Sequence, residues 1–256
     1  YGVKVNVAGG SADENSVKIT GGTISGSAYG ADLSDATSTG TGTKNKAEMT
    51  NGTVNGSLYG AHTAGSGTLS ASEVEVSGGS VGGNVYGSDI ASGAGDATGS
   101  KITISGSTTS ITGSVYGGKT AGTGAATGHK IKLDGGTVGG SVYGGNATSG
   151  AATGNTITLT GGAAVTGSLY GGFTTGGATT GNTVNLGDGT GTLTATTSVT
   201  GTIYGGNQAA DTDNVLNVNT NAQAGNISNF SMVKFNFNST FNQANPMLNL
   251  VGGSAT

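Results

Sequence analysis

The stretch Gly140-Ser141-Val142-Tyr143-Gly144-Gly145 is one copy of a motif that recurs from one end of this chain to the other. In each copy, a glycine stands three residues before the tyrosine and another glycine follows it directly. A small polar residue stands two before the tyrosine, an apolar residue one before it, and a β-branched residue five before it. The tyrosines of the complete copies are Tyr29, Tyr59, Tyr86, Tyr116, Tyr143, Tyr170 and Tyr204. Most of these tyrosines are 27 or 30 residues apart. A motif repeated at such intervals indicates a stack of similar structural units.

The composition of the chain is unusual for a globular protein. Of its 256 residues 54 are glycine, and only 9% are charged. Composition alone suggests a disordered chain, but a disordered linker has no reason to keep β-branched residues in register. A single core for this length also needs more large apolar residues than the chain contains. A solenoid avoids that need, because each coil buries only a narrow strip against its neighbours.

A second recurring segment lies upstream of each tyrosine motif. It is a short apolar-polar-apolar run, such as Val74-Glu75-Val76 or Ile131-Lys132-Leu133, and its period of two predicts a strand. A turn follows, often a glycine pair such as Gly135-Gly136, where glycine permits a sharp corner. The tyrosine motif is the second strand, and a loop of small residues such as 121–128 completes the unit. Most tyrosines are 27 or 30 residues apart, so one unit has about 27–30 residues.

Two strands and a loop in this length predict an all-β, single-stranded parallel β-helix, with coils of about 27–30 residues stacked about 4.8 Å apart. The general preference for right-handed crossovers favours a right-handed helix. We expect residues 1–256 to form one β-helix fragment, with regular coils over 10–210. Residues 211–256 either continue the solenoid with irregular coils or cap it. In this part we expect strands at 233–237 and 247–250. It also contains four of the five phenylalanines, at 230, 235, 237 and 241.

Stacking places equivalent residues above one another in ladders. We expect the valines and isoleucines to line the interior. Five asparagines stand two residues before the leading apolar residue of the first strand, and we expect them to form a structural ladder, because their amides can bond to the next coil. They are Asn15, Asn45, Asn155, Asn182 and Asn214. The alternation of a strand favours tyrosines that point outward together with the preceding serine. An inward orientation stays open if a glycine of the motif breaks the alternation.

Charge and composition argue against several classes of partner. The formal charge is −4, with nine lysines and no arginine, which disfavours nucleic acid and anionic membrane surfaces. No apolar run reaches the length of about 18 residues that a membrane helix needs, so we expect no membrane insertion by this segment. The absence of cysteine excludes disulfides and thiolate sites. The glycine pairs lack the lysine of a phosphate loop, and we expect no cofactor.

The acidic residues and histidines give no convergent reactive group. Glu48 and Glu75 are expected on adjacent coils near Lys18, which is the arrangement closest to the paired carboxylates of a polysaccharide lyase or hydrolase. We interpret it as a solvated charge ladder. His62 and His129 occupy different parts of the coil, and we expect both to be surface residues. The sequence therefore predicts no catalytic and no metal-binding residues.

The Gly-Ser-Val-Tyr-Gly-Gly repeats, alternating with asparagine-led strands and Ala/Thr/Gly loops, resemble the passenger domains of large bacterial autotransporters, the type V secretion family. The resemblance covers residues 10–210 well and the remainder loosely. It implies a right-handed parallel β-helix, export across a bacterial outer membrane, and adhesion or aggregation at the cell surface or outside the cell. The family's signal peptide and membrane barrel are not part of this sequence, so we expect a piece of a longer protein.

These observations predict a non-enzymatic surface segment that acts as an adhesin or as an extended stalk. Its partners are expected to be glycans or proteins of a host or of neighbouring bacterial cells. The tyrosine ladder is the candidate ligand-facing surface, with its rings as stacking platforms for sugars or for a protein. One alternative is a self-assembling filament or surface-layer element, in which rods associate with each other. A second is a polysaccharide lyase or hydrolase on the same fold.

Overall fold

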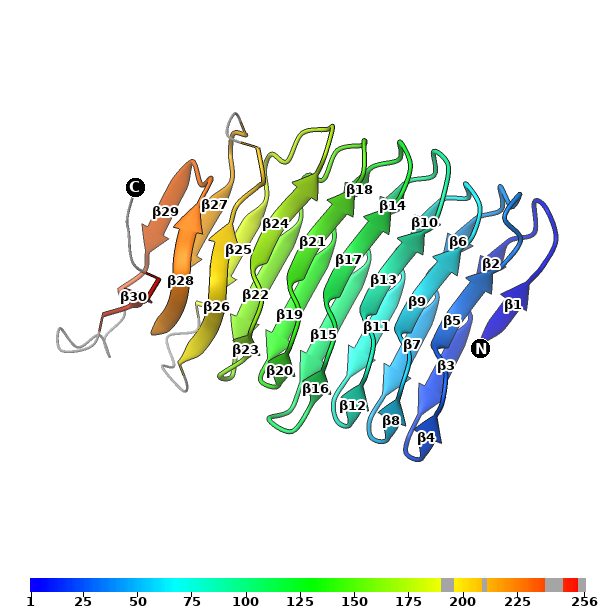
Figure 1. Ribbon diagram of the computed structural model, residues 1–256, viewed down its shortest axis with the longest axis horizontal. Helices are drawn as coiled ribbons and strands as arrows, with labels where there is room; N and C mark the ends of the chain where they lie inside the picture. The colour runs from blue at the N-terminus through cyan, green and yellow to red at the C-terminus, as the bar shows by residue number, and fades with distance from the viewer. Residues whose placement is uncertain (190–195, 209–210, 238–245, 253–256) are drawn as a thin grey trace.

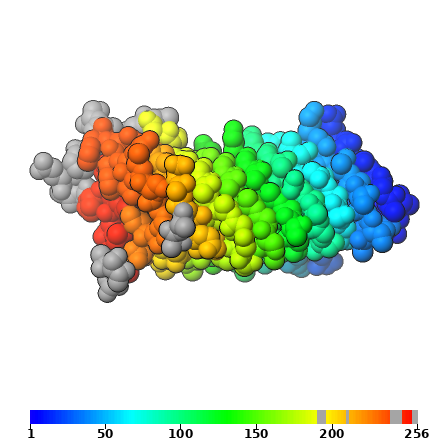
Figure 2. Space-filling model, turned by 90° about the horizontal axis from the view of Figure 1, so that it is seen from above, coloured from blue at the N-terminus to red at the C-terminus, as the bar shows by residue number. Residues whose placement is uncertain are grey.

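The computed structural model describes residues 1–189, 196–208, 211–237 and 246–252. Within these ranges the chain is all β and contains no helix. Its strands follow one another along the rod in chain order and pair in parallel, as in the pairing of β9 with β13 (Figure 1). The molecule is elongated, and the colours from N-terminus to C-terminus form successive bands along its axis (Figure 2). It is a β-solenoid of about 9 turns, which confirms the predicted fold class.

The strands of successive turns form three parallel sheets. The charged sheet has nine strands: β3 (Ser16–Ile19), β7 (Lys46–Met49), β11 (Glu73–Val76), β15 (Lys101–Ser105), β19 (Lys130–Asp134), β22 (Thr156–Thr160), β25 (Thr183–Leu186), β27 (Val215–Val218) and β29 (Met232–Phe235). A sheet of five two-residue strands contains β2 (Ala12–Asp13), β6 (Gly42–Thr43), β10 (Leu69–Ser70), β14 (Ala97–Thr98) and β18 (Ala126–Thr127).

The third sheet, which we call the tyrosine sheet, has sixteen strands. Its long strands are β1 (Val3–Val5), β5 (Ala28–Leu33), β9 (Leu58–Thr63), β13 (Val85–Ile90), β17 (Val115–Thr120), β21 (Val142–Ala147), β24 (Leu169–Thr174), β26 (Thr197–Tyr204), β28 (Ala222–Ser228) and β30 (Leu248–Leu250). Its short strands are β4 (Thr23–Ile24), β8 (Thr53–Val54), β12 (Ser80–Val81), β16 (Ser110–Ile111), β20 (Thr137–Val138) and β23 (Ala164–Val165).

Two details of the coil differ from the sequence prediction. The tyrosine motif is not one continuous strand in most turns, because β8 ends at Val54 and β9 begins at Leu58. The chain bends between them at Gly56, yet Val54 and Leu58 are both fully buried, so the inferred inward direction of these residues holds. The predicted loop 121–128 contains the two-residue strand β18, because small residues of successive turns approach closely enough to pair there.

The main core lies between the charged sheet and the tyrosine sheet. In one turn it takes Val74 and Val76 from β11, Val81 from β12 and Val85 from β13, and all four are fully buried. Burying such a side chain contributes about 1.5–3 kcal/mol. Every turn adds a similar set, so the core is a continuous strip along the rod and depends on the stacking of turns.

A narrow waist separates this core from a smaller one beside the five-stranded sheet. The glycine that follows each tyrosine lies at this waist. A Cβ atom on Gly60 would lie 2.6 Å from the carbonyl oxygen of Gly87 and 3.1 Å from that of Glu73, on the facing strand β11. The smaller core beyond the waist contains residues such as Leu69 and Ile90. Glycine is required after the tyrosine because the two facing chain segments touch there.

The asparagine ladder fills the other side of the waist, and its predicted structural role is confirmed. The backbone N–H of Asn155 donates to Oδ1 of Asn182 over 3.0 Å, and Nδ2 of Asn182 donates to the carbonyl oxygen of Ala152 over 3.1 Å. Asn45 and Asn214 make the same kinds of bond and are fully buried. Each amide therefore satisfies backbone groups that would otherwise be buried without a partner.

His129 belongs to this ladder, so the prediction that it is a surface residue is wrong. Its side chain is fully buried, and its Nδ1 accepts a hydrogen bond of 3.1 Å from the backbone N–H of Ser100, as an asparagine oxygen would. The ring is neutral in this arrangement and carries its proton on Nε2. Burial lowers the pKa of His129 to about 4, because the charged ring would lose its hydration. A hydrogen bond with the backbone of Ala97 favours the charged ring, but by less than burial disfavours it.

The residue two positions after each tyrosine is complementary in size to the ladder residue that it faces. Gly118 leaves room for the His129 ring, since a Cβ atom on Gly118 would lie 2.1 Å from Nε2. In the preceding turn the same two places hold Ser88 and Ser100, whose hydroxyl oxygens are 2.8 Å apart. A larger residue on one side is accommodated by a smaller one on the other, as close packing of the interior demands.

The last turns continue the solenoid. β27 pairs with β25 and β29, and β28 pairs with β26 and β30, all in parallel. β29 and β30 correspond to the strands predicted at 233–237 and 247–250. The side chains of Met232 and Phe235 on β29 are about half exposed, at 50% and 45%. Phe241, the last of the four phenylalanines in this part of the sequence, lies outside the described residues.

The burial of His129 predicts a loss of stability in acid. The unfolded chain binds a proton near pH 6.5 and the folded chain only near pH 4, so the free energy of unfolding falls as pH drops through this window. We expect this one residue to lower it by about 3 kcal/mol between pH 7 and pH 4. His129→Asn should abolish this pH-dependent loss of stability, because asparagine continues the ladder and does not take up a proton. Urea unfolding of both proteins from pH 7 to pH 4 measures the difference, and parallel pH profiles would contradict the prediction.

The close packing at the waist predicts that substitutions at positions 118 and 129 have non-additive effects on the free energy of unfolding. Gly118→Ser alone should lower the free energy of unfolding by about 1–3 kcal/mol, because its Cβ would overlap the His129 ring. The double variant Gly118→Ser/His129→Ser copies the Ser88 and Ser100 pair of the preceding turn. We expect the double variant to be less destabilised than the sum of the two single variants, measured by urea unfolding at pH 7. Additive losses would show that the two positions do not share this space.

Candidate functional site

The tyrosines form one continuous stack along the rod, carried by corresponding positions of β5, β9, β13, β17, β21, β24 and β26. Adjacent ring centroids from Tyr29 to Tyr204 are 4.5–5.0 Å apart, and adjacent ring planes differ by only 2–8°. Tyr1, which lies outside the complete copies of the motif, stacks on Tyr29 with a centroid distance of 5.0 Å. The ring spacing equals the spacing of parallel strands, so one lap of the solenoid advances one ring.

The rings lie on the outer face of the tyrosine sheet. They are not part of either core, whereas the residue before each tyrosine, such as Val142, is fully buried. The preceding polar residues share the outer face and form their own ladder, in which Ser114 Oγ accepts a hydrogen bond of 3.0 Å from the backbone N–H of Ser141. Most of the rings are half-buried, and Tyr86 is only 6% exposed. Of the two orientations left open by the sequence, the structure has the outward one.

The stack limits how the tyrosines can bind a ligand. Each ring from Tyr29 to Tyr170 has a neighbouring tyrosine parallel to it on both sides, so its two faces are covered. The stacking of sugars on these ring faces, as expected from the sequence, is therefore not available. What the ladder offers to a ligand is a row of ring edges and hydroxyl groups. Burial raises the pKa of Tyr86 to about 12, so its hydroxyl stays protonated at neutral pH.

A second row runs beside the rings, three residues after each tyrosine. Its first members are Asp32, His62 and Asp89: His62 Nδ1 is 2.8 Å from an Asp32 oxygen, and His62 Nε2 is 4.0 Å from an oxygen of Asp89. The His62 ring also packs edge-on against Tyr29 and Tyr59. His62 lies in this outer row, in keeping with the expected surface position, but its side chain is only 20% exposed because Asp32 and the tyrosine rings pack against it. Burial raises the pKa of Asp89.

Later members of this row cover the ring edges in other ways. Lys119 Nζ lies beside the stack, 5.7 Å from the Tyr86 centroid and 5.9 Å from that of Tyr116. Phe173 packs edge-on against Tyr143, at 5.8 Å, and against Tyr170, at 5.3 Å. This row is hard to recognise in the sequence because its residue types differ from turn to turn. The constant distance of three residues from each tyrosine was the available signal.

The acidic residues of the charged sheet are paired with lysines. Glu48 and Glu75 are register partners on adjacent turns, as predicted, and Lys18 Nζ lies 2.6 Å from Glu48. Lys46 lies between the carboxylates, 3.8 Å from Glu48, 3.0 Å from Glu75 and 3.6 Å from Glu73. The bond with Lys18 lowers the pKa of Glu48, and the bond with Glu75 raises the pKa of Lys46. This is the expected charge ladder, in which each carboxylate has a cation beside it.

Other groupings of reactive side chains are sparse. In the described part of the chain, no three residues among histidine, aspartate, glutamate and cysteine come close enough to hold a metal ion. The same part contains no helix that could cross a membrane. Asp211 binds the loop of the preceding turn, with its Oδ1 accepting from the backbone N–H of Thr179 over 2.9 Å.

Comparison of this chain with protein families, with curated proteins and with solved structures gave no match. The geometry of its ladders is therefore the basis for any functional assignment.

The stack predicts that each inner tyrosine stabilises the rod through its ring. Tyr143→Ala removes contacts with Tyr116, Tyr170 and Phe173, and we expect it to lower the free energy of unfolding by about 2–4 kcal/mol. Tyr143→Phe keeps the ring and should cost about 1 kcal/mol or less. Tyr1→Ala is the matched control with one ring neighbour and should cost less than Tyr143→Ala. Urea unfolding followed by circular dichroism tests this, and equal losses in the alanine and phenylalanine variants would contradict it.

Proposed function

We propose that this chain is a non-enzymatic rod segment of a bacterial surface protein, of the kind seen in autotransporter passengers, which acts as an extended stalk or adhesin. The observation that supports this is the use of the recurring residues. Tyrosine rings cover each other, asparagine amides bond to the next turn, and lysines neutralise the glutamates beside them. Groups that could do chemistry are thus engaged in holding one turn on the next, which suits a rigid spacer.

The stacked tyrosines also favour adhesion through their ring edges and hydroxyl groups. A ladder of half-buried tyrosines offers phenol hydroxyls at a regular spacing, with serine hydroxyls on the same face. Such a surface suits repeated hydrogen bonds with an extended glycan or a strand of a partner protein. The proposed location, at the cell surface or outside the cell after export across an outer membrane, comes from the family resemblance.

A self-assembling filament is the second candidate. It is favoured by the apolar side chains that the last turns leave exposed: Met232, Val233, Phe235, Phe237, Leu250 and Val251. Exposed apolar groups at one end of a rod suit contact with another chain. Sedimentation velocity over a range of concentrations separates this candidate from a single rod, because a filament former grows with concentration and a stalk does not.

The adhesin is tested on an array of surface glycans with the wild-type chain and with Tyr116→Phe/Tyr143→Phe/Tyr170→Phe. The triple variant keeps the ring stack and loses three hydroxyls. We expect glycan binding that weakens about tenfold or more in the variant, because each hydroxyl contributes a hydrogen bond. Equal binding by both proteins would remove the tyrosine edge as the adhesive surface.

The enzymatic alternative is tested on the same glycans by measuring release of reducing or unsaturated sugars. We expect none above background. Release that disappears in Glu48→Gln/Glu75→Gln would contradict the proposal and assign the lyase or hydrolase function to the paired glutamates.

A further inference from the structure

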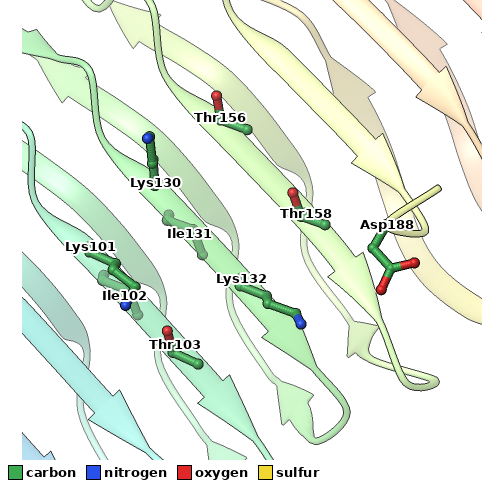
Figure 3. A pocket seen from close by; sticks show the side chains of 9 residues that line it. All are labelled: Lys101, Ile102, Thr103, Lys130, Ile131, Lys132, Thr156, Thr158 and Asp188. Atoms are coloured by element: carbon green, nitrogen blue, oxygen red, sulfur yellow. The ribbon is translucent and has the colours of Figure 1, made fainter. Parts of the chain in front are cut away.

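A shallow hollow of about 300 Å³ lies on the outer face of the charged sheet, away from the tyrosine ladder (Figure 3). Two rows of side chains from β15, β19 and β22 line it in strict register. The first row is Lys101, Lys130 and Thr156, and the second is Thr103, Lys132 and Thr158. Asp188, from the turn after β25, stands at the far side of the hollow (Figure 3).

The charges of this sheet follow a rule in the turns that precede the hollow. Equivalent residues of adjacent turns are nearest neighbours, so like charges repel unless an opposite charge lies between them. Glu48 and Glu75 are such a like pair, and Lys46 lies within 4 Å of both. Lys18 and Glu48 are register partners of opposite charge.

The hollow breaks this rule. Lys101 and Lys130 are register partners of like charge, and Lys132 lies two residues from Lys130 on the same face. Lys101 has Glu73 at 3.1 Å, and Lys132 has Asp134 at 3.5 Å. Lys130 has no carboxylate within 4.0 Å among the residues that the structure describes. Lys130 thus has one lysine beside it in the preceding turn and another two residues along its own strand, without the counter-charge that Lys46 supplies for the glutamates, so an external anion beside it lowers the free energy.

We propose that this hollow binds the carboxylate or sulfate group of an acidic polysaccharide. Lys130 is the main contact for the anionic group, and Lys101 on the neighbouring strand and Lys132 on the same strand add to the positive charge around it. The hydroxyls of Thr156 and Thr158, one turn further along, face the hydroxyl groups of the sugar. Both rows run along the rod at the strand spacing of about 4.8 Å, so an extended polysaccharide that lies along the rod meets one pair of side chains per turn.

The chemistry of the hollow separates this ligand from other polyanions. Arginine is absent from the chain, no aromatic side chain lines the hollow, and the whole protein has a formal charge of −4. Binding to the dense phosphates of a nucleic acid or to an anionic bilayer needs a wide basic surface. One group of three lysines beside threonine hydroxyls, with the carboxylate of Asp188 at the far side of the hollow, suits a more widely spaced set of anions, each on a sugar unit. The site is independent of any binding by the tyrosine edges.

The test compares the wild-type chain with Lys130→Gln/Lys132→Gln by isothermal titration calorimetry. The probes are polygalacturonate, which carries carboxylates, heparin, which carries mainly sulfates, and dextran, which is neutral. We expect wild-type binding to one or both acidic polymers and none to dextran, weakening as salt rises because the attraction is screened. The double variant should bind about ten- to a hundredfold more weakly. Binding to one acidic polymer and not to the other identifies the acidic group.

Lys18→Gln/Lys44→Gln is the matched control. It removes the same charge from two lysines outside the hollow, which pair with Glu48 and Glu14, and its affinity should equal that of the wild type. Lys130→Gln alone should fold as well as the wild type and melt no earlier at low salt, because it relieves repulsion from Lys101.

Three results would overturn the proposal. The first is an absence of wild-type binding to either acidic polymer. The second is equal weakening by the control variant, which would indicate net charge alone. The third is equal affinity for duplex DNA or for phosphatidylglycerol vesicles. Since the tyrosine variants are tested separately, failure here leaves the rod and its tyrosine surface as a distinct question.

Discussion

Parallel strands of successive turns lie about 4.8 Å apart, so the nearest neighbour of a residue is its own equivalent in the next turn. Each position of the repeat must therefore tolerate a copy of itself. Valine, tyrosine, asparagine and serine do so, by packing, ring stacking or hydrogen bonding. Charges do not, and the charged sheet accordingly mixes signs between turns, as in Lys46, Glu73 and Lys101. The residue types permitted at each place in the coil follow from this single distance.

The tyrosine-glycine pair meets two requirements of the coil at once. The ring lies outside and covers the sheet, while the glycine lies inside at the waist, where the facing strand leaves no room for a Cβ atom. Opposite that glycine stands the asparagine ladder, which supplies bonds to buried backbone groups. His129 shows how far the ladder tolerates change. It keeps the acceptor role through Nδ1, and it introduces a buried group that can take up a proton in acid.

Stacking also determines which surfaces can bind a partner. Rings that cover one another present only edges, so a motif rich in tyrosine does not imply an aromatic platform. On the charged sheet, ion pairs between turns neutralise most of the lysines and glutamates. Our functional proposals concern the two surfaces that still present polar or charged groups to solvent after the turns have stacked. One has hydroxyl edges along the tyrosine sheet, and the other has the like-charged lysines of the hollow.

The period of the motif and the alternation around each tyrosine were sufficient to predict the parallel solenoid, the buried β-branched strip and the asparagine ladder. They favoured outward rings but left the inward orientation open. These features depend on local spacing, which the sequence contains. Only the tertiary structure decided the waist, the burial of His129, the network around His62 and the register of Lys101 with Lys130. Those features depend on which residues of different strands and turns face each other, and variable loops shift that correspondence by several residues from turn to turn. A repeat thus determines the shape of a coil, while contacts across and between coils determine the environment of each side chain.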